Sequence, residues 1–152
     1  MGRIMSIIEK IVEGSKIRID GRDYSVLGKT MYVTQGSPDM VYAKVLLENH
    51  FVLVISPSDE VAYFGKNEGH LNEFDEYPQS VVYNGNEYHQ VAHDYQIVMN
   101  IVFGDPLLVE GEVEYWDYES NDNIISVAVT SREQIRADVV AHYLNFSDIM
   151  IL

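Results

Sequence analysis

"VVYNGNEY", residues 81–88, decides the fold, because the chain contains nearly the same phrase at residues 17–24, "IRIDGRDY". Both run apolar, variable, apolar, then Asp or Asn, Gly, a polar residue, an acid and Tyr. Asp-Gly and Asn-Gly between alternating apolar residues favour a type I′ hairpin, since both central positions of that turn need positive φ. The repeated phrase therefore predicts two tight hairpins and an internal duplication of the chain.

Outward from each hairpin the apolar period is two, which is typical of β-strands. After the first hairpin come "VYAKVLL" (41–47), "FVLVIS" (51–56) and "EVAYFG" (60–65). After the second come "YQIVMNIVF" (95–103), "GEVEYWDY" (111–118) and "IISVAVT" (124–130). The stretch 67–80 between the two series is polar, contains Gly69 and Pro78, and is predicted to be a connection.

The predicted fold is mainly β, at the margin of α+β, in a single compact domain over residues 1–152. The first β half covers residues 15–66 and the second covers 81–152. One half would be a small sheet with an uncovered face, so the two antiparallel halves are expected to pack as a sandwich or as paired, partly open barrels.

A short amphipathic helix is predicted at residues 4–13, ahead of the first half. The apolar residues at helical spacing are Ile4, Ile7, Ile8, Ile11 and Val12. Gly14 is placed to end the helix. We expect its apolar stripe to pack on the body of the domain; docking onto a partner or a membrane surface is the alternative.

The formal net charge of −14 is unevenly distributed. No Lys or Arg occurs between Lys66 and Arg132, while thirteen acids lie in that gap. Such a surface repels phosphate backbones, so nucleic-acid binding is not expected, and an anionic membrane would be approached only through a partner or cation. A basic protein partner, a bound cation and mimicry of a nucleic acid remain open beside plain solubility.

Composition narrows the class of protein further. The chain has 152 residues and no Cys, which excludes disulfides, Cys-based zinc sites and a thiol nucleophile. It has no run of 18 apolar residues, so no transmembrane segment is predicted. The first residues do not resemble a signal peptide, and a cytoplasmic location is the expectation.

The stretch "VFGDPLLVEGEVEYWDY", residues 102–118, carries a family resemblance. It resembles the bacterial and archaeal domain of unknown function 4178, whose second half has a Gly-Glu-x-Pro-Trp-like turn, a Gly-acid pair and an Asp-Tyr pair. The matching positions are Gly104, Asp105, Pro106, Gly111, Glu112, Asp117 and Tyr118. Leu107 stands where the family has Trp. The resemblance covers most of residues 14–152 and implies a β-rich fold.

The resemblance also bears on the tail. Residues 132–146 fit a helix through Ile135, Val139 and Tyr143, or a strand through Val139, Ala141 and Tyr143. The resemblance favours the strand.

Candidate binding residues gather in the same stretch. Glu110, Glu112 and Glu114 share one face of a predicted strand, and Trp116 and Tyr118 continue that face. Parallel carboxylates repel one another, so a cation or a basic partner could lie across them. The full candidate set is Asp105, Glu110, Glu112, Glu114, Trp116, Asp117 and Tyr118. The two glycines flanking Pro106, Gly104 and Gly111, are predicted to be structural, with positive φ.

No metal centre, cofactor site or catalytic set is predicted. His89 and His93 are four residues apart, on one face of a regular strand, and are the candidate metal ligands. "GKT" at 28–30 lacks the phosphate-loop Gly, since Asp23 stands there, and "DYESNDN" at 117–123 has Asp122 where a calcium loop needs Gly.

The sequence thus indicates a non-enzymatic binding or scaffolding module that acts through protein–protein contacts. The first alternative is a hydrolase-type enzyme using carboxylates such as Asp105, Glu112 and Asp117, which would have to converge in a pocket. The second alternative is an acidic mimic that blocks a nucleic-acid-binding protein.

Overall fold

The computed structural model describes residues 2–107 and 111–152. The first half forms α1 (Gly2–Lys10), β1 (Lys16–Ile19), β2 (Arg22–Thr34), β3 (Ser37–Leu47), β4 (Phe51–Ser56) and β5 (Val61–Asn67). The second forms β6 (Ser80–Tyr83), β7 (Asn86–Gly104), β8 (Glu112–Ser120), β9 (Asn123–Thr130), β10 (Arg136–Leu144) and β11 (Ile149–Ile151). Short 3₁₀ turns are η1 (Glu48–His50), η2 (Asn72–Phe74) and η3 (Phe146–Asp148).

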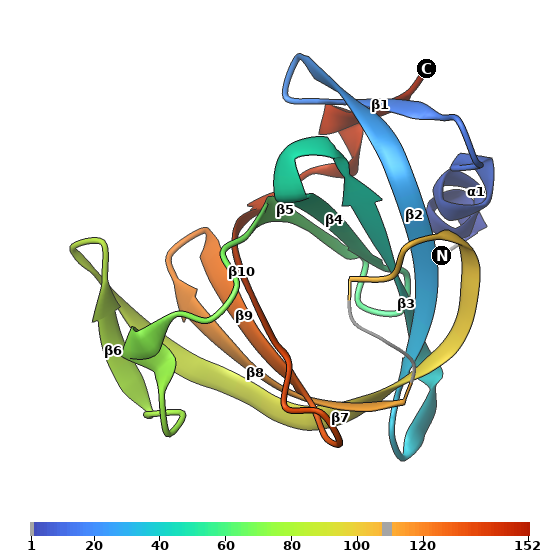
Figure 1. Cartoon of the computed structure of the whole chain (residues 1–152). Helices are drawn as coiled ribbons and strands as arrows, with labels where there is room; N and C mark the ends of the chain where they lie inside the picture. The colour runs from blue at the N-terminus through green and yellow to red at the C-terminus, as the bar shows by residue number, and fades with distance from the viewer. Residues whose placement is uncertain (1, 108–110) are drawn as a thin grey trace.

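The strands of the described part form one antiparallel sheet, in the order β11-β1-β2-β3-β4-β5-β10-β9-β8-β7-β6. Strand β2 pairs with β7 as well, and this extra pairing closes the strands from β2 to β7 into a ring (Figure 1). The prediction of a mainly β fold with a short N-terminal helix is confirmed. The two halves join edge to edge in this one sheet. The alternation of apolar and polar residues predicted the strands, but it does not specify which strands pair.

Both predicted hairpins are present. The central residues of the first turn, Asp20 and Gly21, have φ of 50° and 80°, and those of the second, Asn84 and Gly85, have 55° and 81°. In each hairpin the two residues that flank the turn pair with each other across the strands. The repeated phrase was therefore a correct guide to local structure.

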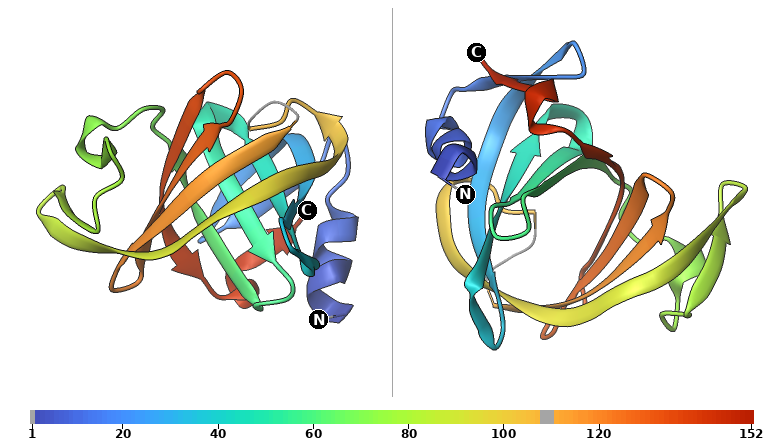
Figure 2. Two further views of the ribbon diagram at one scale, coloured as in Figure 1. Left: turned by 90° about the horizontal axis from the view of Figure 1, so that it is seen from below. Right: turned by 180° about the vertical axis from the view of Figure 1, so that it is seen from behind.

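The two halves use their strands in the same way. Strands β1–β5 and β6–β10 follow each other in the same order, and the halves meet where β2 pairs with β7 and where β5 pairs with β10. Each seam thus joins strands that hold the same place in their own half. Figure 2 shows the ring from two further sides, with β6 and the start of β7 extending to one side of it.

Helix α1 and β1 cover the outer face of the first half. Ile8 and Ile11 are buried against outward-facing residues of the ring such as Val45 and Leu53. The helix ends at Lys10, three residues before the predicted end. Its last carbonyls are held by Lys29, whose buried Nζ donates to Ile8 O at 2.9 Å and Ile11 O at 2.6 Å. The lysine of the "GKT" stretch therefore serves to attach the helix.

The connection and the β6–β7 hairpin cover the outer face of the second half. Phe74 of η2 is fully buried with Tyr118, and Tyr77 stacks on Trp116 with ring centroids 3.5 Å apart. The tail is a strand, β10, as the family resemblance implied. Among the described residues, no helix has the length and apolar character needed to cross a membrane.

Candidate functional site

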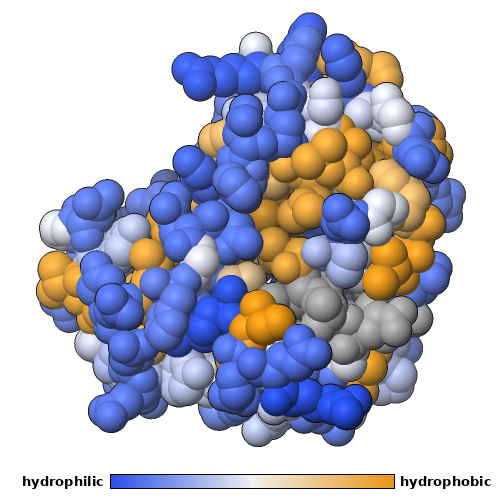
Figure 3. Space-filling model, in the orientation of Figure 1, coloured by the Kyte–Doolittle hydropathy of each residue, from blue (hydrophilic) through white to orange (hydrophobic). Residues whose placement is uncertain are grey.

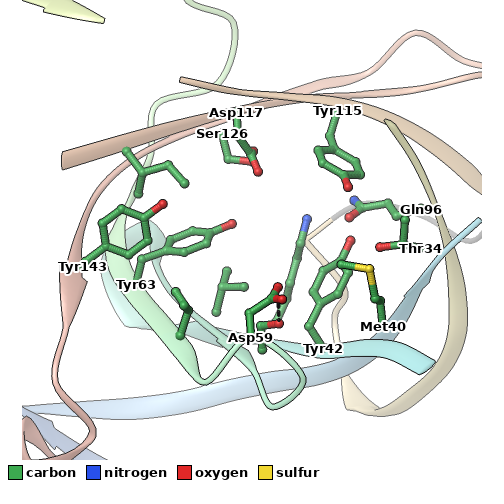
Figure 4. Close-up of a pocket in the computed structure, with 15 residues that line it drawn as sticks. Thr34, Met40, Tyr42, Asp59, Tyr63, Gln96, Tyr115, Asp117, Ser126 and Tyr143 are labelled. Carbon is green, nitrogen blue, oxygen red and sulfur yellow. Dashed lines mark hydrogen bonds between the residues drawn. The ribbon is translucent and has the colours of Figure 1, made fainter. Parts of the chain in front are cut away.

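The inner face of the ring lines a cavity of about 260 Å³. Side chains of a strand alternate between its two faces, so every second residue of the ring strands points inward. Tyr42 and Lys44 of β3 reach the cavity from the first half, and Tyr115 and Asp117 of β8 reach it from the second (Figure 4). The site is therefore built by both halves together.

Apolar residues of the cavity lining, Val54 and Ile124, belong to a hydrophobic cluster inside the ring. Leu107 packs against Val139 and Val113 inside the ring, where it belongs to two small hydrophobic clusters. Met40 and Asp59, which also line the cavity, are exposed at its rim. Figure 3, in the orientation of Figure 1, shows hydrophobic side chains gathered within the ring and hydrophilic ones around it.

Lys44 is a buried cation in this cavity. The residue is 6% exposed, and its Nζ lies 4.7 Å from the ring centroid of Tyr32 and 5.9 Å from that of Tyr42. In the described part of the chain no carboxylate pairs with it within 4.0 Å. Burial disfavours the charged amine and lowers the pKa of Lys44 to about 8, although the charge of Asp117 acts in the opposite direction.

Asp117 supplies the opposite charge from β8. Its Oδ1 accepts a hydrogen bond from Ser126 Oγ at 2.7 Å. Burial raises the pKa of Asp117 to about 6, although the Ser126 hydrogen bond and the Lys44 charge both favour the ionised form. The cavity thus holds an acid and an amine whose pKa values have both moved toward neutrality, a combination found at many functional sites.

Hydrogen-bonding groups converge on the centre of the cavity. The hydroxyls of Tyr42, Tyr63 and Tyr115 point inward (Figure 4). Burial raises the pKa of Tyr63 far above its ordinary value, so this hydroxyl remains a donor. Gln96 is 2% exposed, and its Nε2 has no hydrogen-bond partner among the described residues. A buried donor left unpaired costs free energy, which a ligand acceptor would recover.

Most of the candidate residues from the sequence lie elsewhere. Glu114, Trp116 and Tyr118 share one face of β8, as predicted. It is the outer face, where the aromatic pair is buried under the connection. His93 stacks on Trp116 with centroids 4.7 Å apart, and its Nε2 lies 2.6 Å from Glu114 Oε2. The predicted patch of aromatic and acidic side chains is thus largely covered by the protein itself.

The carboxylates considered for an enzyme do not meet. Asp117 faces the cavity, Asp105 is exposed after β7, and Glu112 is exposed at the start of β8, where its Oε1 accepts from Ser131 Oγ at 3.0 Å. Glu110 lies outside the described residues. Of the candidate set, Asp117 is the residue that the described structure brings into the cavity.

The two candidate metal ligands face opposite sides of the sheet. A β-bulge between Gln90 and Ala92 sets His89 opposite Glu119 and His93 opposite Trp116, and residues directly opposite each other share a face. The prediction assumed a regular strand, which would have kept both on one side. Among residues 2–107 and 111–152, no group of three or more His, Asp or Glu is arranged to hold a metal ion.

Sequence reasoning missed Lys44, Gln96 and the tyrosines of the cavity. Lys44 sits in "VYAKVLL", where neighbours on both faces of the strand are apolar or aromatic. A single lysine in such a run indicates a strand that is buried on both faces, because a strand with one solvent-exposed face would alternate polar and apolar residues. Gln96 carries no comparable signal, since a single amide in a strand is common.

Comparison with known proteins gives a family but no close relative. No curated protein and no solved structure has significant similarity to the chain. The family model described as domain of unknown function DUF4178 matches residues 13–139, which include the β1–β9 strands and the first part of β10. The expected resemblance is confirmed, and the chain belongs to the DUF4178 family.

Proposed function

We propose that the protein is a binding module that holds a small polar molecule inside the ring. The observation that carries this proposal is a buried, unpaired donor facing the cavity that Lys44 also lines. The amide nitrogen of Gln96 has no hydrogen-bond partner, and Lys44 forms no ion pair within 4.0 Å, among the described residues. Buried polar groups are normally paired, so donors left open beside a cavity favour a missing acceptor.

The lining indicates the chemistry of the ligand. Lys44 and Gln96 favour an oxygen acceptor such as a carbonyl, hydroxyl or carboxylate. Tyrosine rings together with Val54 and Ile124 favour an apolar or aromatic body next to that group. The cavity has the volume of roughly nine water molecules at about 30 Å³ each, which limits the ligand to a small metabolite-sized compound.

A ligand screen tests the proposal. Wild-type protein and the variant Gln96→Leu would be followed by thermal denaturation and NMR against benzoate, acetophenone, benzyl alcohol and benzylamine. A saturable ligand raises the melting temperature of the wild type, since it binds the folded state, and binds Gln96→Leu at least about tenfold more weakly. Gln35→Leu is the matched control, because Gln35 is exposed at the end of the same ring strand pair.

Two results would contradict this function. The proposal fails if no probe binds the wild type saturably at low millimolar concentration. It also fails if every probe binds Gln96→Leu as tightly as the wild type.

A protein adaptor is the second candidate function. The observation in its favour is a set of exposed apolar residues on β7: Val91, Tyr95, Ile97 and Val102. Exposed apolar patches often mark interfaces. Cross-linking and mass spectrometry in native lysate, with wild type compared with Ile97→Lys, would test it. Loss of a defined cross-linked partner in the variant supports the adaptor, and identical cross-links contradict it.

We also propose that the two halves arose by internal duplication. The repeated hairpin phrase, the matching order of strands and the pairing of corresponding strands at both seams support this origin. A superposition of residues 16–67 on residues 80–144 should align β1–β5 with β6–β10 in order. A best superposition that aligns the strands in another order would contradict duplication.

A further inference from the structure

Lys29 and Lys44 are both 6% exposed, but their surroundings differ. Lys29 Nζ donates two hydrogen bonds to carbonyls at the end of α1 and just after it. Lys44 Nζ has aromatic rings beside it and a cavity before it. An amine on a largely buried residue, facing a cavity and without an ion pair among the described residues, is in the environment that turns lysine into a nucleophile.

We propose that Lys44 captures a small aldehyde or ketone in the ring as an imine. The proposal rests on the proposed function, because it requires that the cavity accept a small molecule, and it adds the class of that molecule. Asp117 is the acid of the reaction. It faces the same cavity from β8 and keeps one carboxylate oxygen, Oδ2, outside the Ser126 hydrogen bond.

The reaction is balanced without an oxidant or reductant. The neutral Nζ of Lys44 attacks the carbonyl carbon, the carbonyl π pair moves to oxygen, and one amine proton transfers to that oxygen to give a carbinolamine. The Asp117 carboxyl then protonates the hydroxyl, which leaves as water while the nitrogen lone pair forms the C=N bond. The remaining N–H proton passes to the Asp117 carboxylate. Amine and carbonyl compound are consumed, and one imine and one water are produced.

The charges around Lys44 suit this step at neutral pH. A pKa of about 8 leaves roughly a tenth of Lys44 neutral at pH 7, against less than about 0.1% for an ordinary lysine. A pKa of about 6 allows Asp117 to alternate between acid and base in the same range. The tyrosines facing them, Tyr42, Tyr63, Tyr115 and Tyr143, have pKa values raised by burial and stay uncharged. Asp59 lies at the rim.

Reductive trapping tests the proposal on the intact chain. The protein would be mixed with limiting benzaldehyde and sodium cyanoborohydride at pH 7, and the benzylated lysines would be mapped by mass spectrometry over time. Lys44 should be labelled at least about tenfold faster than the exposed Lys66 or the capping Lys29, because more of it is neutral. Equal rates at these lysines, or no label at Lys44, would overturn the proposal.

Variants test the roles of Lys44 and Asp117 separately. Lys44→Met should remove the fast adduct, and the matched control Lys66→Met should keep it. Asp117→Asn should slow imine formation about tenfold at pH 6 and flatten its pH profile. An unchanged pH profile in Asp117→Asn would overturn the role given to Asp117.

The outcomes distinguish this inference from the proposed function. If Lys44 stays unlabelled while the neutral probes still bind in a Gln96-dependent way, imine capture is wrong and the binding module stands. If no probe binds and Lys44 is unlabelled, both are wrong.

Discussion

Asp117 is a carboxyl group that the folded protein prefers to keep protonated. Its pKa is about 6 in the folded chain and near 3.8 when exposed. The folded state therefore holds the proton of Asp117 more tightly than the unfolded state. The contribution of Asp117 to the free energy of unfolding is most favourable below about pH 4 and falls as the pH rises from about 4 to 6. The penalty is then constant up to neutral pH.

Asp117→Asn should remove this penalty. Relative to the wild type, the variant should gain about 2 kcal/mol of unfolding free energy between pH 4 and pH 7.5, since part of the two-unit shift is lost to screening across the cavity. Urea denaturation of both proteins at the two pH values measures it. A difference between variant and wild type that is the same at both pH values would contradict the buried charge.

Gly104 has a structural role that the sequence also predicted. Its φ is +69°, and an added Cβ would lie 2.8 Å from Gly28 Cα and even closer to the Leu27 carbonyl. Gly111 likewise has positive φ, at +122°, so both predicted conformations are confirmed. Gly104, at the end of β7, is paired with Gly28 of β2, and this pair is at one end of the β2–β7 ladder.

Gly104→Ala should therefore be far more costly than Gly36→Ala. Gly36 has φ of +80°, but an added Cβ there would meet no atom within 4 Å, so the change should cost about 1 kcal/mol through backbone strain. At Gly104 a steric clash with backbone is added, and the loss should be at least about 3 kcal/mol. Thermal and urea unfolding would compare the two, and equal losses would show that β7 and β2 can separate locally.

At the residue scale, prediction from sequence reached the conformations but missed most of the site. Local chemistry dictated the Asp-Gly and Asn-Gly turns and the positive φ of Gly104. Whether a face of β8 looks outward or into a cavity depends on ring closure, which no local pattern carries. The candidate set therefore combined Asp117 with Glu112 and Trp116, which lie on the opposite face of β8, and Lys44 was not considered.

At the scale of elements, the connection between the halves is fixed by a buried ion pair. Arg136 donates from Nε to Asp138 Oδ1 at 3.0 Å and from Nη2 to Asp138 Oδ2 at 2.6 Å. Asp138 Oδ2 also accepts from Leu71 N at 2.9 Å. Burial raises the pKa of Asp138 in spite of these partners. Burying the Arg136–Asp138 pair therefore costs desolvation free energy. Burying one of the two charges without its partner would cost more.

Asp138→Ala should destabilise the protein by about 3 kcal/mol, because the Leu71 amide loses its acceptor and the buried Arg136 is left with the longer, 3.6 Å ion pair to the exposed Asp75. The connection should also become sensitive to limited proteolysis near η2. The double variant Arg136→Met with Asp138→Leu should recover most of the loss, since no buried charge remains. If the double variant is no more stable than Asp138→Ala, the ion pair itself is stabilising.

Elements were predicted better than their arrangement. The series of strands, the connection and the short helix follow from apolar period and turn residues, which act over a few positions. The β-bulge that places His89 and His93 on opposite faces is a change in the register of β7 against β8, and the sequence of β7 alone does not predict it. The helix end at Lys10 is likewise decided by the capping Lys29, which lies on another element.

At the scale of the molecule, ring closure is the feature that sequence could not supply. The β2–β7 and β5–β10 pairs join residues far apart in the chain. The residue pattern of a strand does not specify which other strand it will pair with. The repeated hairpin phrase gave a partial guide, because two similar open sheets can close a ring by pairing corresponding strands. The ring then creates an inner face, and with it the cavity.

The charge of the whole molecule sets its response to salt. Thirteen acids without a Lys or Arg lie between residues 66 and 132, and the net charge of −14 leaves no surplus of basic groups to neutralise them. In the described part of the chain, exposed acids of this stretch include Glu73 and Glu76 of the connection, Glu87 and Asp94 of β7 and Glu112 of β8, so like charges repel across the surface. Screening shortens the range of that repulsion from about 30 Å at 0.01 M salt to about 10 Å at 0.1 M.

The melting temperature should therefore rise between about 0.01 and 0.3 M sodium chloride. The variant Glu76→Gln with Glu87→Gln, which removes exposed acids, should melt higher at low salt and gain less from added salt. A melting temperature that stays flat or falls with salt would contradict the repulsion. Calcium or magnesium chloride at matched ionic strength should act like sodium chloride, because screening depends on ionic strength. A saturable additional rise below about 1 mM divalent ion would instead require a specific cation site.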